Sequence, residues 1–238
     1  MHTQTIDYRG NDTLVLQAYM AYEDSTKQKR PVVLIAHTWC GRDNFVEEKA
    51  RYLAELGYIG FVMDVYGKGI FGDGSETNQK LMQPLMKDRK ILLQRLTAGL
   101  NTAKRVEVAD KERIAAMGYC FGGLCVLDLA RSGADLKGVV SFHGLLQASK
   151  EVPAKNVKAK VLALHGRDDP MVPANDVLEF EKEMTDANVD WQLHVFGGTM
   201  HAFTNPEAND FKMGVVYNPQ AEKRSWLEAV HFFEEIFQ

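Results

Sequence analysis

Cysteine is scarce in this sequence: the 238 residues contain three cysteines, Cys40, Cys120 and Cys125. Three thiols at these spacings form neither an even disulfide framework nor a paired set of metal ligands. His37 stands three residues before Cys40, but no third and fourth ligand at a credible spacing accompany them. We therefore expect reduced thiols, no structural disulfide and no metal site.

An excess of positive charge and long apolar segments are missing as well. The formal net charge is -4 and the basic residues are scattered, which excludes the electrostatic footprint of a nucleic-acid-binding protein. No stretch is long and apolar enough to cross a bilayer, and residues 1–9 hold no apolar run after a basic segment. We expect a cytoplasmic protein with neither nucleic acid nor membrane as a partner.

Repeats, low-complexity tracts and linkers are also absent from the chain. Hydrophobic residues make up 45% and charged residues 25% of a length that suits one large domain. Strand-length apolar runs alternate with helix-like segments, which is typical of a mostly parallel sheet covered by helices. The sequence predicts a single α/β domain over residues 1–238, built as a three-layer sandwich, and a homodimer is the default assembly.

The apolar periodicity assigns the individual elements. Strands are expected at 13–22 near an antiparallel edge, and at 31–36, 59–64, 114–117, 138–142, 161–164 and 191–196. Helices are expected at 43–56, 75–104 with a break at Pro84, 121–131, 174–187 and 220–237.

A cysteine sits where a buried strand turns sharply into a helix, in the run Gly118-Tyr119-Cys120-Phe121-Gly122. This is the Gly-x-nucleophile-x-Gly elbow with sulfur in the place of the usual serine. The glycines allow close backbone packing around a strained turn. The helix that begins at Phe121 directs its positive dipole end toward the sulfur, which favours a thiolate. The pattern predicts a nucleophilic hydrolase with Cys120 as the nucleophile.

A nucleophile of this kind needs a base and an acid that orients the base, and in this architecture the acid and then the histidine follow it along the chain. His194 lies within a strand and His231 on the closing helix, whereas His201 follows Gly197-Gly198 in a loop after the last strand. His201 is therefore the predicted base.

Two aspartates, Asp168 and Asp169, occur in the loop that leaves the 161–164 strand. Either can reach the imidazole Nδ1 and hold its tautomer. The spacing to Val172-Pro173 favours Asp169, and Asp168 is then a turn residue.

The oxyanion hole is expected to use two backbone N–H groups. The first belongs to Phe121, directly after the nucleophile, and the second to the loop His37-Thr38-Trp39-Cys40-Gly41, with Trp39 as the favoured donor.

With these motifs in place, the chain resembles the dienelactone hydrolase family within the α/β-hydrolase fold. The resemblance extends over nearly the whole chain and depends on Gly118–Gly123, Gly166–Pro173 and His201-Ala202-Phe203. It implies a Cys120, His201, Asp169 triad that works with no metal and no organic cofactor.

The residues expected to bind substrate depart from the family pattern. Family enzymes that cleave dienelactone carry two arginines for the substrate carboxylate, and the matching positions here are Lys68 and Asn205, which weakens bidentate carboxylate binding. Thr38 stands where those enzymes hold a glutamate that engages the resting thiol. Without it, we hypothesise a resting ion pair of Cys120 thiolate and His201 imidazolium. Phe203 is a candidate pocket wall.

The leading interpretation is a metal-independent hydrolase of small esters or lactones with a covalent cysteine intermediate. The second is hydrolysis of activated phosphoesters, including phosphotriesters, by the same thiolate, since Asn205 and Thr38 suit an uncharged substrate. The third is a redox-responsive thiol or a binding protein on a hydrolase scaffold, which would have no need of a histidine and an aspartate in this order.

Overall fold

The structure, a computed structural model, describes residues 1–10, 13–25 and 28–238. The chain divides into two compact units, Met1–Ala116 and Met117–Gln238. The prediction of a single domain over 1–238 stays a prediction.

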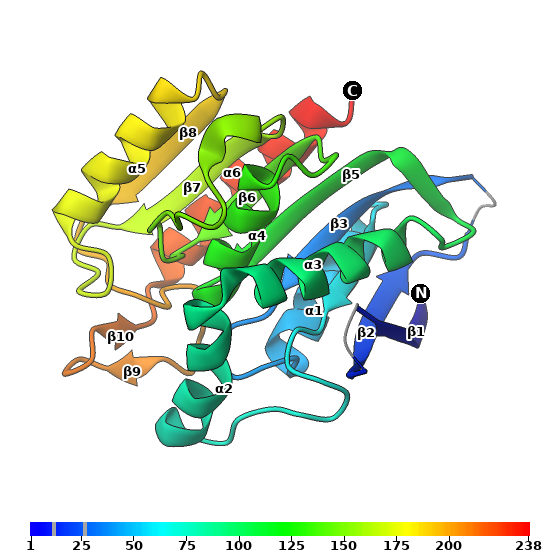
Figure 1. The fold of residues 1–238 in the computed structure, drawn as a ribbon, viewed down its shortest axis with the longest axis horizontal. Coiled ribbons are helices and arrows are strands. Elements are labelled where there is room, and N and C mark those ends of the chain that lie inside the picture. Colours follow the sequence, from blue (N-terminus) through cyan, green and yellow to red (C-terminus); the bar gives the residue numbers. More distant parts are fainter. Residues whose placement is uncertain (11–12, 26–27) are drawn as a thin grey trace. The chain divides into compact units, whose positions relative to one another are not determined.

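The first unit contains β1 (His2–Arg9), β2 (Val15–Tyr22), β3 (Arg30–Ala36), α1 (Asn44–Glu55), β4 (Ile59–Met63), α2 (Ser75–Lys87) and α3 (Arg89–Ala103) (Figure 1). β3 and β4 pair in parallel, while β2 pairs antiparallel with both β4 and β1. The expected antiparallel strand is therefore confirmed as β2. β1 was missed because it is an edge strand with mostly exposed polar side chains, so it lacks a clear apolar alternation.

Close contacts at two glycines show how the helices of this unit cover the sheet. A Cβ on Gly60 of β4 would lie 2.5 Å from Cα of Ala50 in α1, and a Cβ on Gly99 of α3 would lie 2.8 Å from the sulfur of Met63. Residues 60 and 63 point to opposite faces of β4, because side chains alternate along a strand. α1 and α3 therefore cover opposite faces of the strands in this unit.

The predicted helix over 75–104 is two helices, and the expected position of the break is wrong. Pro84 lies inside α2, where it removes a single backbone hydrogen bond on an exposed stretch. The chain breaks instead at Asp88, whose Oδ1 accepts from the backbone N–H groups of Lys90 and Ile91 at 3.1 and 3.0 Å. A capping carboxylate therefore starts α3 and sets the boundary.

Strand β5 (Ala109–Tyr119) runs past the unit boundary and ends at Tyr119, directly before the elbow. The remaining elements are α4 (Phe121–Arg131), β6 (Gly138–Phe142), the 3-10 turn η1 (Ala154–Asn156), β7 (Lys160–Gly166), α5 (Ala174–Asp186), β8 (Trp191–Phe196), β9 (Asn209–Asp210), β10 (Val215–Val216) and α6 (Pro219–Ile236). Within the second unit β6, β7 and β8 are consecutive parallel strands.

The helices α4 and α6 lie on the two faces of these parallel strands (Figure 1). A Cβ on Gly138 would lie 2.7 Å from the ring of Phe232 in α6, and a Cβ on Gly123 of α4 would lie 2.5 Å from Oγ of Ser141. Residues 138 and 141 point to opposite faces of β6. The carboxyl ends of β6 and β7 thus lie together at one edge, where loops can assemble a site.

A buried arginine fixes the loop that follows β6. Arg131, at the end of α4, donates to Oδ1 of Asp128 at 3.2 Å, to both carboxylate oxygens of Glu183 in α5, and to the carbonyl of Leu146 at 2.9 Å. The Arg131 side chain is fully buried, so its positive charge would carry a large desolvation penalty without these partners. The network therefore ties α4, α5 and the post-β6 loop together.

Candidate active site

Cys120 occupies the predicted elbow between the end of β5 and the start of α4. Its φ of 56° and ψ of -117° lie outside the ordinary regions for an L-residue, and its backbone N–H donates to the Phe142 carbonyl at 3.0 Å. A Cβ on Gly118 would clash with the backbone carbonyl of Gly122, which explains why position 118 lacks a side chain. The half-buried sulfur is thus presented at the amino end of a helix, where the helix dipole favours negative charge.

Asp169 and His201 lie side by side in the second unit. His201 Nδ1 lies 2.7 Å from Oδ2 of Asp169, and both side chains are almost fully buried. The other oxygen of Asp169 accepts from the Met171 N–H at 2.8 Å. The carboxylate is therefore fixed from two sides. It accepts a hydrogen bond from Nδ1 and orients the ring so that Nε2 points away from Asp169.

Asp168 has a different environment from its neighbour. Its side chain is exposed, and its backbone N–H donates to the Thr199 carbonyl at 2.9 Å. The structure thus places Asp169, and not Asp168, against the imidazole.

Burial and two neighbouring side chains act in opposite directions on the pKa of His201. Burial lowers its pKa, but the charge of Cys120 and the hydrogen bond to Asp169 outweigh burial and raise the pKa to about 10. The charge of Cys120 is the largest of the effects that raise this pKa, and burial is the one that opposes it. Below about pH 10 the imidazole therefore keeps its proton.

The loop that carries His201 is held by the short hairpin of β9 and β10, which the sequence analysis missed. The His201 N–H donates to the Gly214 carbonyl, and the His201 carbonyl accepts from the Val216 N–H, both at 2.9 Å. The next residue, Ala202, has a φ of 56°. Two-residue strands give no detectable periodicity, so no sequence signal marked this hairpin.

A second buried histidine, His143, follows β6 and was also missed. Its ring lies 5.1 Å from the His201 ring, edge to face, and its Nε2 lies 2.8 Å from Oγ1 of Thr204. Its position directly after a parallel strand was the available signal, because polar residues at the carboxyl ends of such strands gather at one edge.

A third imidazole, His165, lies at the carboxyl end of β7. It is buried, and burial lowers its pKa even though the charge of Asp169 acts to raise it. His165 is thus neutral at pH 7 and adds no second positive charge near His201.

Phe203 and Asn205, two predicted substrate-binding residues, follow His201. Phe203 is completely buried and packs on His143 and Phe196 at ring distances of 5.1 and 5.6 Å. Asn205 is half-buried and its side-chain oxygen accepts from the Glu207 N–H at 3.0 Å. Their substrate-binding roles stay predictions.

Thr38, Trp39 and Lys68 belong to the first unit. Lys68 is exposed and pairs with Asp7 at 2.6 Å. Thr38 and Trp39 are half-buried in the loop after β3, and the Trp39 carbonyl accepts from the Tyr66 hydroxyl at 3.0 Å. The roles of Phe121 and Trp39 as oxyanion donors stay predictions.

His37 shapes this loop as a neutral imidazole. Its Nε2 accepts from the Val65 N–H at 3.3 Å, so Nδ1 carries the proton and donates to the Thr38 carbonyl at 2.6 Å. Complete burial lowers the pKa of His37, which keeps this single tautomer. The ring therefore fixes the backbone conformation directly before Trp39.

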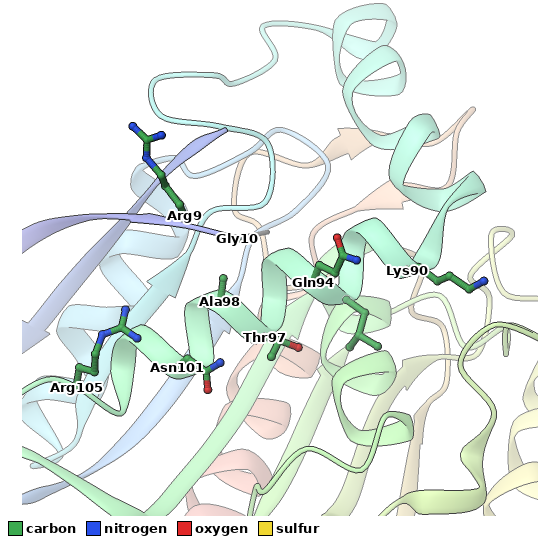
Figure 2. Close-up of a pocket in the computed structure, with 9 residues that line it drawn as sticks. Arg9, Gly10, Lys90, Gln94, Thr97, Ala98, Asn101 and Arg105 are labelled. Atoms are coloured by element: carbon green, nitrogen blue, oxygen red, sulfur yellow. The ribbon is translucent and has the colours of Figure 1, made fainter. Parts of the chain in front are cut away.

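A groove of about 470 Å³ lies in the first unit along α3. Figure 2 shows Lys90, Gln94, Thr97, Asn101 and Arg105 on the helix, with Arg9 at the end of β1. None of the predicted site residues lines it.

Over residues 1–10, 13–25 and 28–238, no three His, Cys, Asp or Glu side chains are grouped so that they could hold a metal ion. Within the same ranges no helix is both long and apolar enough to span a membrane.

The chain was compared with known proteins. The sequence pattern of the dienelactone hydrolase family matches residues 16–237. A protein of Aquifex aeolicus named "Putative carboxymethylenebutenolidase" is 27% identical over 97% of both chains. The solved structure named m3DLH is 33% identical with a TM-score of 0.94, covering 100% of this chain and 99% of that one. A dienelactone hydrolase-like promiscuous phosphotriesterase from metagenomic libraries is 30% identical with a TM-score of 0.93 and the same coverage.

The expected mixed α/β fold, with a mostly parallel sheet flanked by helices, is confirmed.

Proposed function

Because the chain belongs to the dienelactone hydrolase family and is a hydrolase, we propose that it cleaves small esters or lactones with Cys120 as nucleophile, His201 as base and Asp169 as orienting acid. The observation that carries the proposal is the buried 2.7 Å contact between His201 and Asp169, in the same unit as a strained cysteine at a helix amino end. A merely structural thiol would need neither partner.

The first half of the reaction acylates the cysteine. The Cys120 thiolate attacks the carbonyl carbon, a C–S bond forms, and the carbonyl oxygen becomes an oxyanion that accepts from the backbone N–H groups of Phe121 and Trp39. The tetrahedral intermediate then collapses, the C–O bond breaks, and the alkoxide takes the proton from Nε2 of His201. The products of this half are an alcohol and a thioester.

The second half hydrolyses the thioester. Acylation removes the negative charge of Cys120, and that charge is one of the causes that raise the pKa of His201. The pKa of the imidazole therefore falls in the acyl-enzyme, so His201 becomes a base at neutral pH. It takes a proton from water, the hydroxide attacks the thioester carbon, and the C–S bond breaks to release the acid and restore the thiolate.

Phosphotriester hydrolysis is the second candidate. One similar structure is described as a promiscuous phosphotriesterase, and the predicted substrate contacts Thr38 and Asn205 are both uncharged. The same two N–H donors can stabilise a phosphoryl oxygen. We propose this as an additional activity of the same thiolate.

The test is a burst assay in the presence of EDTA with p-nitrophenyl butyrate and with an uncharged phosphotriester. We expect a burst of p-nitrophenolate, unaffected by EDTA, and a butyryl adduct that peptide mass spectrometry locates on Cys120. Ester turnover that disappears on chelation, or an adduct on another residue, would contradict the mechanism. The ratio of the two kcat/KM values ranks the substrate classes.

The resting ion pair makes a separate prediction about pH. Because His201 keeps its proton up to about pH 10, the thiolate has a cationic partner throughout the neutral range. Alkylation of Cys120 by iodoacetamide is therefore expected to be nearly as fast at pH 7 as at pH 9, within about threefold. The rate is measured by peptide mass spectrometry, with the half-buried Cys40 as the internal reference thiol. A Cys120 rate that climbs about tenfold per pH unit up to about pH 8.5, as for an ordinary thiol, would refute the ion pair.

A further inference from the structure

The segment Phe142–His143 at the end of β6 is bonded to the backbone on two sides. The Phe142 carbonyl accepts from the N–H of Cys120 at 3.0 Å, and the N–H of His143 donates to the Leu164 carbonyl of β7 at 2.8 Å. β7 leads into the loop that carries Asp169. This segment is therefore fixed against both the nucleophile and the strand that positions the acid.

The side chain of His143 reaches the third part of the proposed centre. Its Nε2 lies 2.8 Å from Oγ1 of Thr204, three residues after His201, and both side chains are buried. Its ring packs edge-to-face on the rings of His201 and Phe203, each at 5.1 Å. One side chain thus holds the His201 loop by a hydrogen bond and limits rotation of the His201 ring by contact.

The backbone at His143 is strained. Its φ is 39°, and the only other non-glycine residues with positive φ among the described residues are Cys120, Asn188 and Ala202. Three of these four therefore belong to the nucleophile, to the residue after the base and to His143. Strain of this kind persists where surrounding contacts impose it, and it gathers at functional sites.

We infer that His143 is a positioning residue of this centre. Through its contacts with Thr204 and with the His201 ring, it holds the His201 imidazole in the orientation that the reaction with Cys120 requires. The inference rests on the proposed function of Cys120 and His201. His143 is buried, so it acts on the reaction through His201 rather than by touching the substrate.

A double-mutant cycle with a rescue variant tests the role. His143→Phe keeps a ring but removes the nitrogen that meets Thr204, and Thr204→Val removes the hydroxyl at nearly constant volume. Each single change is expected to lower kcat by roughly tenfold, because small misplacements of a reacting group reduce the rate steeply, and to change KM by less than about twofold. The double variant is expected to lose no more than either single variant, since both remove the same contact.

His143→Gln is the conservative rescue, because its amide can reach the position of Nε2. We expect its kcat to stay within about threefold of the wild type. Alkylation of Cys120 by iodoacetamide at pH 7 is expected to slow in His143→Phe and to recover in His143→Gln. This readout needs no substrate, so it separates failure of the positioning role from failure of the proposed hydrolysis.

Phe180→Leu provides the control for lost stability, since Phe180 is a buried residue of α5 that packs on Trp191 of β8. Thermal unfolding is recorded for every variant, and kcat is expressed per folded protein. Phe180→Leu is expected to lower the melting temperature with kcat unchanged. Equal kcat and alkylation rates in wild type and His143→Phe, single losses that multiply in the double variant, or a His143→Gln as slow as His143→Phe would each overturn the role.

Discussion

Replacing Cys120 with alanine is expected to lower kcat/KM for p-nitrophenyl butyrate by at least about 10³-fold, which corresponds to about 4 kcal/mol of transition-state stabilisation. The proposed reaction passes through a covalent thioester, and alanine offers no atom that can form it. The residual rate would come from the oxyanion donors and from binding alone. The variant should also show neither burst nor adduct, and phosphotriester turnover should fall in parallel if the same thiolate acts on both.

Cys125→Ala is the matched control. Cys125 lies on α4, the helix that follows Cys120, and its side chain is buried. Its replacement is expected to leave kcat/KM within about threefold, because the proposed chemistry does not use it. If Cys120→Ala kept wild-type activity, the nucleophile assignment would fail, and a redox or binding role for the thiol would become the leading interpretation.

Replacing Asp169 with asparagine is the second large change, with an expected loss of about 10² to 10⁴-fold in kcat. The carboxylate Oδ2 accepts from Nδ1 of His201, and an amide nitrogen at that position would favour the wrong tautomer. The loss of the Asp169 charge and hydrogen bond would also lower the pKa of His201, because both act to raise it. Alkylation of Cys120 at pH 7 should therefore slow in this variant as well.

Asp168→Asn is the control for this experiment, since Asp168 is the adjacent residue of the same type and is exposed. Its kcat is expected to stay within about threefold of the wild type, in line with ordinary surface substitutions. A pattern in which Asp168→Asn is the slow variant, and Asp169→Asn the fast one, would reverse the assignment of the acid.

Several features were predictable because they depend on local chemistry. The elbow around Cys120 needs glycines at fixed spacing, so its sequence carries the signal directly. The strands 138–142 and 191–196 and the helix 121–131 have the predicted bounds, because each is a largely apolar segment of ordinary strand or helix length. The break at Asp88 could also have been anticipated, since an aspartate cap outweighs an exposed proline near the end of a helix.

The sequence by itself determined the glycine-flanked elbow at Cys120 and the alternation of strands and helices. It also reduced the candidate bases and acids to a few residues, because all of these features depend on residue type and spacing. Only the tertiary structure decided that Asp169 is buried against His201 while Asp168 faces solvent. The same holds for the His143 ring beside His201 and for the hairpin that supports the loop of His201. The contacts of His201 with Asp169 and of His143 with Thr204 join residues 32 and 61 positions apart, and such long-range contacts leave no periodic trace in the chain.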